Sequence, residues 1–164
     1  MEVMHSHRWE ARAPDWVAAA VSGFVAGAVL MVLELVWSVV SGESPWRVSN
    51  MIAAITMGPD VMQSTGFHIG AVVTALLTHY VLGIVFGMIL ATIVASFNFD
   101  SSPGLVLTVG GVFGFVLYLL NFYGMSAFFP WFAKMRDWGT LWGHVIFGMT
   151  VAYMYWQLEK RSPS

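Results

Sequence analysis

Apolar residues run along this chain in four long blocks separated by short polar segments. The blocks cover residues 15–41, 67–97, 104–123 and 138–156. A helix needs about 20 predominantly apolar residues to cross the hydrocarbon of a bilayer, and each block is close to that length or longer. The pattern therefore predicts an all-α fold, an integral membrane four-helix bundle that forms a single transmembrane domain over residues 1–164.

A shorter apolar segment, residues 45–57, follows the first block. Pro45 suits the first turn of a helix, and the Gly58-Pro59 pair must end one. The apolar core of this segment, about ten residues, is too short to cross the hydrocarbon. We therefore expect a short interfacial or re-entrant helix after the first span.

Composition supports a lipid environment for this chain. Hydrophobic residues make up 58% of it and charged residues only 10%, whereas an ordinary soluble domain is about a quarter charged. With so few charges the expected partner of most of the surface is the lipid bilayer. The net charge of −2 provides no basic patch for nucleic acid. The absence of cysteine excludes disulfides, iron–sulfur clusters and cysteine nucleophiles.

Four crossings place both termini on one side of the membrane and the two long connections on the other, which we call the loop side. Lysine and arginine number four on the side of the termini (Arg8, Arg12, Lys160, Arg161) and three on the loop side (Arg47, Lys134, Arg136). The positive-inside rule then favours cytoplasmic termini. His5 and His7 are interpreted as part of a solvated tail rather than as metal ligands.

Two segments of the chain resemble each other. Residues 27–34, GAVLMVLE, and 114–121, GFVLYLLN, share Gly, Val, Leu and Leu in register, and each leads to a Pro-Trp turn and then to a His-x-x-x-Gly helix. The pattern is consistent with a duplicated two-helix hairpin whose halves are related by an axis along the membrane normal. Apolar segments also align by chance, so both explanations remain open.

In each predicted span, the polar residue lies on the same helical face as the glycines of that span or one turn away from a glycine. Membrane helices approach one another closely at such glycines, so these polar side chains should point into the bundle. The expected cluster, in the loop-side half of the bundle, comprises Glu34, His79, Asn121, Tyr123 and His144. An ionisable group in mid-membrane costs about 2.5 to 3.5 kcal/mol, which favours a functional role. The alternative is that a neutral Glu34 is hydrogen-bonded to a histidine or to Asn121 and only holds helices together.

A second group of residues lies in the loops. We expect Arg47, Trp131, Lys134, Arg136 and Asp137 to anchor the loops at the lipid headgroups. Capture of an anionic substrate beside Arg136 is the alternative.

No cofactor is expected from these patterns. Haem between His79 and His144 is disfavoured because their depths differ by about 9 Å on the helix rise. A zinc site of Glu34, His79 and His144 is chemically acceptable, but no dense ligand motif supports it, so the question of a metal stays open. The chain has no phosphate-binding glycine loop, nucleophile elbow or HExxH motif, so we do not expect an enzyme.

Three stretches carry a resemblance to known proteins: GESPWRVSNMIAAITMG, NFYGMSAFFPWFAKMRDW and GHVIFG. With them the chain resembles a group of small bacterial four-helix inner-membrane proteins without an established activity, some of them labelled sodium:proline symporters. The resemblance implies the four-helix topology and a multi-pass location in the bacterial inner membrane. We expect a homo-oligomer that moves a proton, an ion or a small solute through the polar cluster. The alternative is a non-catalytic accessory subunit of a larger membrane complex, such as a respiratory assembly.

Overall fold

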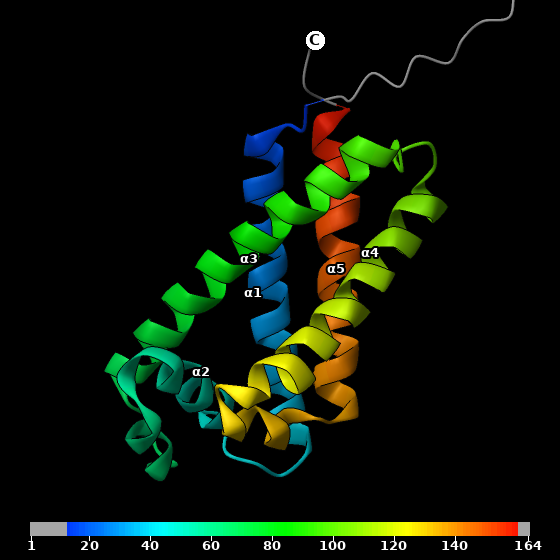
Figure 1. Cartoon of the computed structure of the whole chain (residues 1–164). Coiled ribbons are helices and arrows are strands. Elements are labelled where there is room, and N and C mark those ends of the chain that lie inside the picture. The colour runs from blue at the N-terminus through cyan, green and yellow to red at the C-terminus, as the bar shows by residue number, and fades with distance from the viewer. Residues whose placement is uncertain (1–12, 161–164) are drawn as a thin grey trace, which may run out of the picture.

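The computed structural model describes residues 13–160, and every regular element in this part of the chain is helical. The α-helices are α1 (Trp16–Val40), α2 (Arg47–Met57), α3 (Ile69–Phe97), α4 (Pro103–Leu119) and α5 (Trp138–Glu159) (Figure 1). Four short turns complete the fold: η1 (Pro59–Gln63), η2 (Leu120–Gly124), η3 (Met125–Ala127) and η4 (Pro130–Met135). The predicted all-α fold class is confirmed. His5, His7, Arg8, Arg12 and Arg161, on which part of the orientation argument depends, lie outside the described residues.

Within the described residues, three helical segments are long and apolar enough to cross a membrane. They are α1, α3 and the continuous segment Pro103–Ala127, which joins α4 to η2 and η3. The helix α5 has 22 residues and matches the fourth predicted block in position, but it is not among the three. The helix α2 occupies most of the segment in which a short helix was expected.

The long helices are arranged around a central antiparallel pair. Helices α1 and α5 lie side by side, α3 packs on α1, and α4 packs on α5. Helices α3 and α4 contact each other much less. They meet near the turn at residues 98–102 and diverge toward the end of the molecule that carries α2 and the short turns, which we call the loop end (Figure 1).

Reciprocal glycine contacts hold the two closely packed helix pairs together. A Cβ atom at Gly23 would clash with the backbone carbonyl of Gly83, and one at Gly83 would clash with the carbonyl of Gly23. The same reciprocal relation joins Gly110 of α4 to Gly148 of α5. In the predicted repeat, Gly23 corresponds to Gly110 and Gly83 corresponds to Gly148. The α1/α3 and α4/α5 crossings are therefore arranged as a duplicated hairpin requires. The duplication itself stays a prediction.

The two halves differ in how they meet. In the predicted repeat, α1 corresponds to α4 and α3 corresponds to α5. The contact between α1 and α5 therefore corresponds to the contact between α4 and α3. This α3/α4 contact opens toward the loop end, where α2 packs against α3 and η1 packs against α2 (Figure 1). If the chain is a duplicated hairpin, α2 and η1 form an inserted segment of the first copy, and this segment lies where the fold departs from symmetry.

Buried apolar side chains form two clusters. The larger lies among the long helices and includes Leu30, Leu90, Val151 and Tyr155. The smaller lies at the loop end, between α2, the end of α4 and η4, and comprises Met51, Tyr118, Phe122, Phe132 and Met135. The loops are thus packed against the helices rather than extended into solvent.

Candidate functional site

A cavity of about 300 Å³ lies where α3 and α4 diverge. Its walls come from all five α-helices and from the turns η2, η3 and η4. Most of its lining is apolar. The polar residues that line it are Glu34, Thr78, His79, Asn121 and His144. Four of the five residues of the predicted cluster therefore share one cavity.

Glu34 and His79 face each other across the α1/α3 contact. A close approach of the helices brings them together, because a Cβ at Gly27 would lie only 3.7 Å from the backbone oxygen of His79. The Nε2 atom of His79 is 3.9 Å from Oε2 of Glu34. This distance is too long for a direct hydrogen bond. The Glu34 side chain is only 7% exposed.

His144 and Asn121 form a second polar pair. The Nδ1 atom of His144 lies 2.9 Å from the backbone oxygen of Thr140, and a carbonyl only accepts, so Nδ1 carries the proton. In the neutral ring Nε2 is then an acceptor, and the Asn121 amide nitrogen donates to it at 3.4 Å. Asn121 belongs to η2, a single π-helical turn. Such turns are frequent at functional sites.

Tyr123 does not join these residues. It does not line the cavity, it is 54% exposed, and the Arg136 guanidinium lies 4.3 Å from the centre of its ring. The reason is helical geometry: two residues correspond to roughly half a turn, in the π-helical turn η2 as in an α-helix. With Asn121 facing the cavity, Tyr123 must therefore point away from it.

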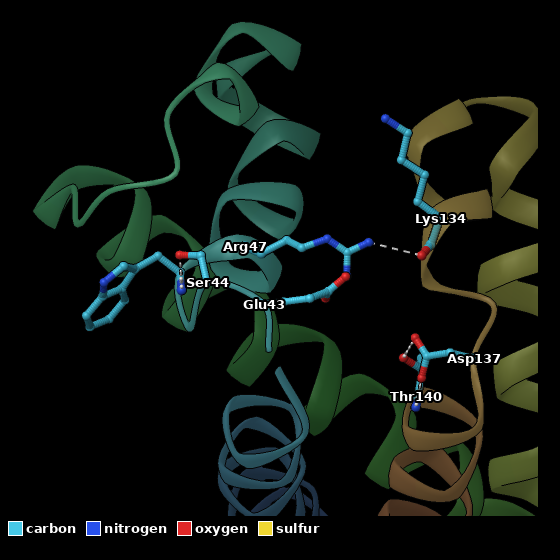
Figure 2. Close-up of polar contacts among 7 residues, drawn as sticks. Glu43, Ser44, Arg47, Lys134, Asp137 and Thr140 are labelled. Carbon is cyan, nitrogen blue, oxygen red and sulfur yellow. Dashed lines mark hydrogen bonds and ion pairs between the residues drawn. The ribbon is translucent and has the colours of Figure 1, made fainter. Parts of the chain in front are cut away.

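The predicted loop anchors mainly join one loop to the other. The Arg47 side chain pairs with Glu43, and its Nη2 atom donates to the backbone oxygen of Lys134 at 3.1 Å (Figure 2). Trp131 Nε1 donates to the backbone oxygen of Met51 at 3.0 Å. The Lys134 ammonium group points away from the Arg47 contact in Figure 2. Contact of these residues with lipid headgroups stays a prediction.

Arg136 and Asp137 stabilise the two helix ends that flank the loop. Arg136 donates from Nε to the backbone oxygen of Phe122 at 2.7 Å and from Nη2 to Ser126 Oγ at 2.8 Å. Asp137 is the N-cap of α5, since its Oδ1 accepts from the backbone N–H of Thr140 at 2.9 Å. The loop therefore helps to fix the positions of Asn121 and His144 relative to each other.

Replacing Asp137 with alanine should lower the stability of the protein by about 0.5 to 2 kcal/mol, because the first turn of α5 loses its cap. Thermal unfolding in detergent measures the change. Asp137→Asn keeps a capping oxygen and should unfold close to the wild-type temperature. Equal losses in both variants would show that the negative charge, rather than the cap, is what matters.

A small crevice at the loop end also reaches the carboxyl group of Glu34. It is lined by Glu34, Trp37, Ser38, Glu43, Arg47, Val48, Met135, Asp137, Gly139 and Thr140. Glu34 and Met135 line both this crevice and the large cavity. The sequence analysis predicted neither the crevice nor the presence of Thr78 in the cavity. The one local signal for Thr78 was that this polar residue directly precedes His79.

The described residues contain no group of three His, Cys, Asp or Glu side chains that could hold a metal ion. Glu34, His79 and His144 share the cavity without forming a three-ligand site. The cavity therefore presents two polar pairs, each with a histidine, within apolar walls.

Neither a family model, nor a curated protein sequence, nor a solved structure matches this chain. The fold defines the class of protein. This is an all-helical protein in which three described helical segments are long and apolar enough to cross a membrane.

Proposed function

We propose that the chain is an integral protein of a bacterial inner membrane in which α5 is a fourth span beside α1, α3 and α4. The burial pattern of α5 supports this placement. Its polar residues Thr140 and His144 are buried, while its exposed large side chains are Trp138, Trp142, Ile146 and Tyr153. A helix with this pattern presents an apolar and aromatic surface to its surroundings, as a lipid-facing helix must.

Within this framework, the protein moves a proton through Glu34, alone or together with a small solute in the cavity. One observation carries the proposal: the Glu34 carboxyl group lines both the large cavity and the crevice at the loop end. Met135, the other residue common to both, cannot exchange a proton. Glu34 is therefore the titratable group at the boundary between the two spaces.

The geometry suggests the order of proton transfer. The crevice is also lined by the carboxyl groups of Glu43 and Asp137, and we infer that a proton enters beside them and then reaches Glu34. From Glu34 it transfers to Nε2 of His79 after the 3.9 Å gap closes. His144 donates its Nδ1–H to the Thr140 carbonyl, and its Nε2 atom accepts from the Asn121 amide, so this ring takes no part in the proposed transfer until the contact with Asn121 breaks.

Reconstituted vesicles test the proposal directly. Purified protein in lipid vesicles that contain a pH-sensitive dye should dissipate an imposed pH gradient faster than protein-free vesicles of the same lipid. A potassium ionophore is present in both samples, so that the membrane potential is the same in vesicles with and without protein. Equal rates with and without protein would overturn the proposed proton movement.

Cysteine labelling tests the proposed topology, because the natural chain has no cysteine. Ala127→Cys lies in the exposed part of the loop end, and Ser101→Cys lies in the exposed turn between α3 and α4. With cytoplasmic termini, a membrane-impermeant thiol reagent added to intact spheroplasts should modify Ala127→Cys and leave Ser101→Cys unmodified. The reverse pattern would invert the orientation, and modification of both would contradict the four-span topology.

The proposal includes assembly, because four helices around a cavity of about 300 Å³ leave little room for a solute to cross the membrane within one copy. Purification from native membranes in a mild detergent, with the mass of the complex and its components determined together, should show a homo-oligomer. A stoichiometric larger partner would instead indicate an accessory subunit of that partner's complex.

A further inference from the structure

The lining of the large cavity is better suited to an organic molecule than to a file of water. Five phenylalanines contribute to it: Phe86, Phe122, Phe129, Phe132 and Phe147. A volume of about 300 Å³ lies at the lower end of the range for small-molecule sites, which are mostly apolar with a few polar groups that orient the ligand. The size suits a compound of one or two rings.

The open side of this cavity lies between α3 and η2. Two of its lining residues, Leu82 of α3 and Leu120 of η2, are 42% and 54% exposed. Leu82 is roughly 20 Å along α3 from Ile69, the first residue of that helix. In the proposed orientation this depth corresponds to the hydrocarbon region. A molecule that passes Leu82 and Leu120 must therefore be soluble in lipid.

The Glu34 carboxyl group has a free capacity for hydrogen bonding toward this cavity. Within residues 13–160 no hydrogen bond to this carboxyl group is found, and the Nε2 atom of His79 lies 3.9 Å from its Oε2 atom. Its oxygens are not among the fully buried side-chain atoms without a partner, of which the described residues contain only Asn50 Oδ1, so they are partly accessible from the cavity that Glu34 lines. A ligand hydroxyl group would supply the missing donor.

We propose that the cavity binds an uncharged, lipid-soluble aromatic alcohol that reaches it from the bilayer between α3 and η2. The ring lies among the phenylalanines, and the hydroxyl group donates to a carboxyl oxygen of Glu34. The inference rests on the proposed function, since it names the class of solute for the same cavity. It concerns binding alone, so it is testable without any measurement of flux.

A matched pair of probes tests the hydroxyl contact. 2-Naphthol and 2-methylnaphthalene have nearly the same size and shape, and only the first carries a donor. Binding is measured by calorimetry with the full-length protein in lipid nanodiscs, with the signal of empty nanodiscs subtracted. We expect 2-naphthol to bind about tenfold more tightly, as one buried hydrogen bond predicts. Equal affinities for the two probes would overturn the proposal.

Two substitutions of the carboxyl group separate this inference from proton movement. Glu34→Gln keeps an acceptor oxygen, so the preference for 2-naphthol should persist even though proton exchange is lost. Glu34→Leu removes the acceptor and should abolish the preference. If wild-type vesicles move protons while the probes bind equally, only the ligand assignment fails. If the preference is present and no proton moves, only the proposed function fails.

A bulky residue at the opening tests the access route. Leu82→Trp should weaken 2-naphthol binding by about tenfold or more, because the larger side chain fills the opening. Val81→Trp is the control, since Val81 is 59% exposed on the same helix and does not line the cavity. Leu120→Trp approaches the opening from η2 and replaces the test if Leu82→Trp does not fold. Wild-type affinity in a folded opening variant would overturn the lateral route.

Discussion

Glu34→Gln should abolish proton movement in reconstituted vesicles while the protein accumulates in the membrane at wild-type level. The substitution keeps the size and hydrogen-bonding capacity of the side chain but removes the exchangeable proton. Loss of a positioned proton-transfer group typically costs about a hundredfold or more in rate. No other carboxyl group among the described residues lines both the cavity and the crevice, so we expect none to take over this role.

The measurement is the initial rate of pH change inside the vesicles, normalised to the amount of inserted protein. Asp60→Asn provides the matched control, because Asp60 is an exposed carboxylate on η1 that lines neither space. Its rate should equal that of the wild type. Full activity of Glu34→Gln, or a loss of protein that accounts for the lost activity, would contradict the role given to this carboxyl group.

Gly110→Ala and Gly111→Ala should differ sharply in stability although they are neighbours on one helix. A Cβ at position 110 would lie only 2.7 Å from the Cβ of Ala152 and would also clash with the backbone carbonyl of Gly148. Neither can yield without moving α4 away from α5. A Cβ at position 111 would meet the Met149 side chain at 3.6 Å, which is an ordinary contact.

Overpacking of this kind costs about 1 to 3 kcal/mol. Gly110→Ala should therefore unfold at a clearly lower temperature in detergent, and Gly111→Ala should stay close to the wild type. Gly23→Ala, at the equivalent crossing of α1 with α3, should behave like Gly110→Ala. Equal losses at positions 110 and 111 would show that glycine is needed there for a reason other than the helix crossing.

The Gly110 substitution also bears on the site. Helix α4 leads directly into η2, which carries Asn121, while α5 carries His144. A displacement of α4 from α5 would lengthen the 3.4 Å contact between these two side chains. Gly110→Ala should therefore disturb the site as well as the stability, although it lies far from Asn121 along the chain.

Local patterns accounted for much of the architecture. A spanning helix needs a long apolar run, and Pro and Gly interrupt such runs for reasons of backbone geometry. The helical segments therefore follow from the apolar runs and from the Pro and Gly residues between them. The lining of the cavity by Glu34, His79, Asn121 and His144 follows from helical periodicity beside glycines. Tyr123 was expected with them, and its two-residue offset from Asn121 already argued against it.

The sequence by itself thus determined an all-helical, strongly apolar protein with a few polar side chains directed toward its glycine contacts. Only the tertiary structure decided that α3 and α4 diverge, that a mainly apolar cavity opens between them, and that Glu34 lies between this cavity and the crevice at the loop end. The reason is physical. Periodicity is a property of each helix alone, whereas a cavity depends on how helices and loops distant in sequence pack together.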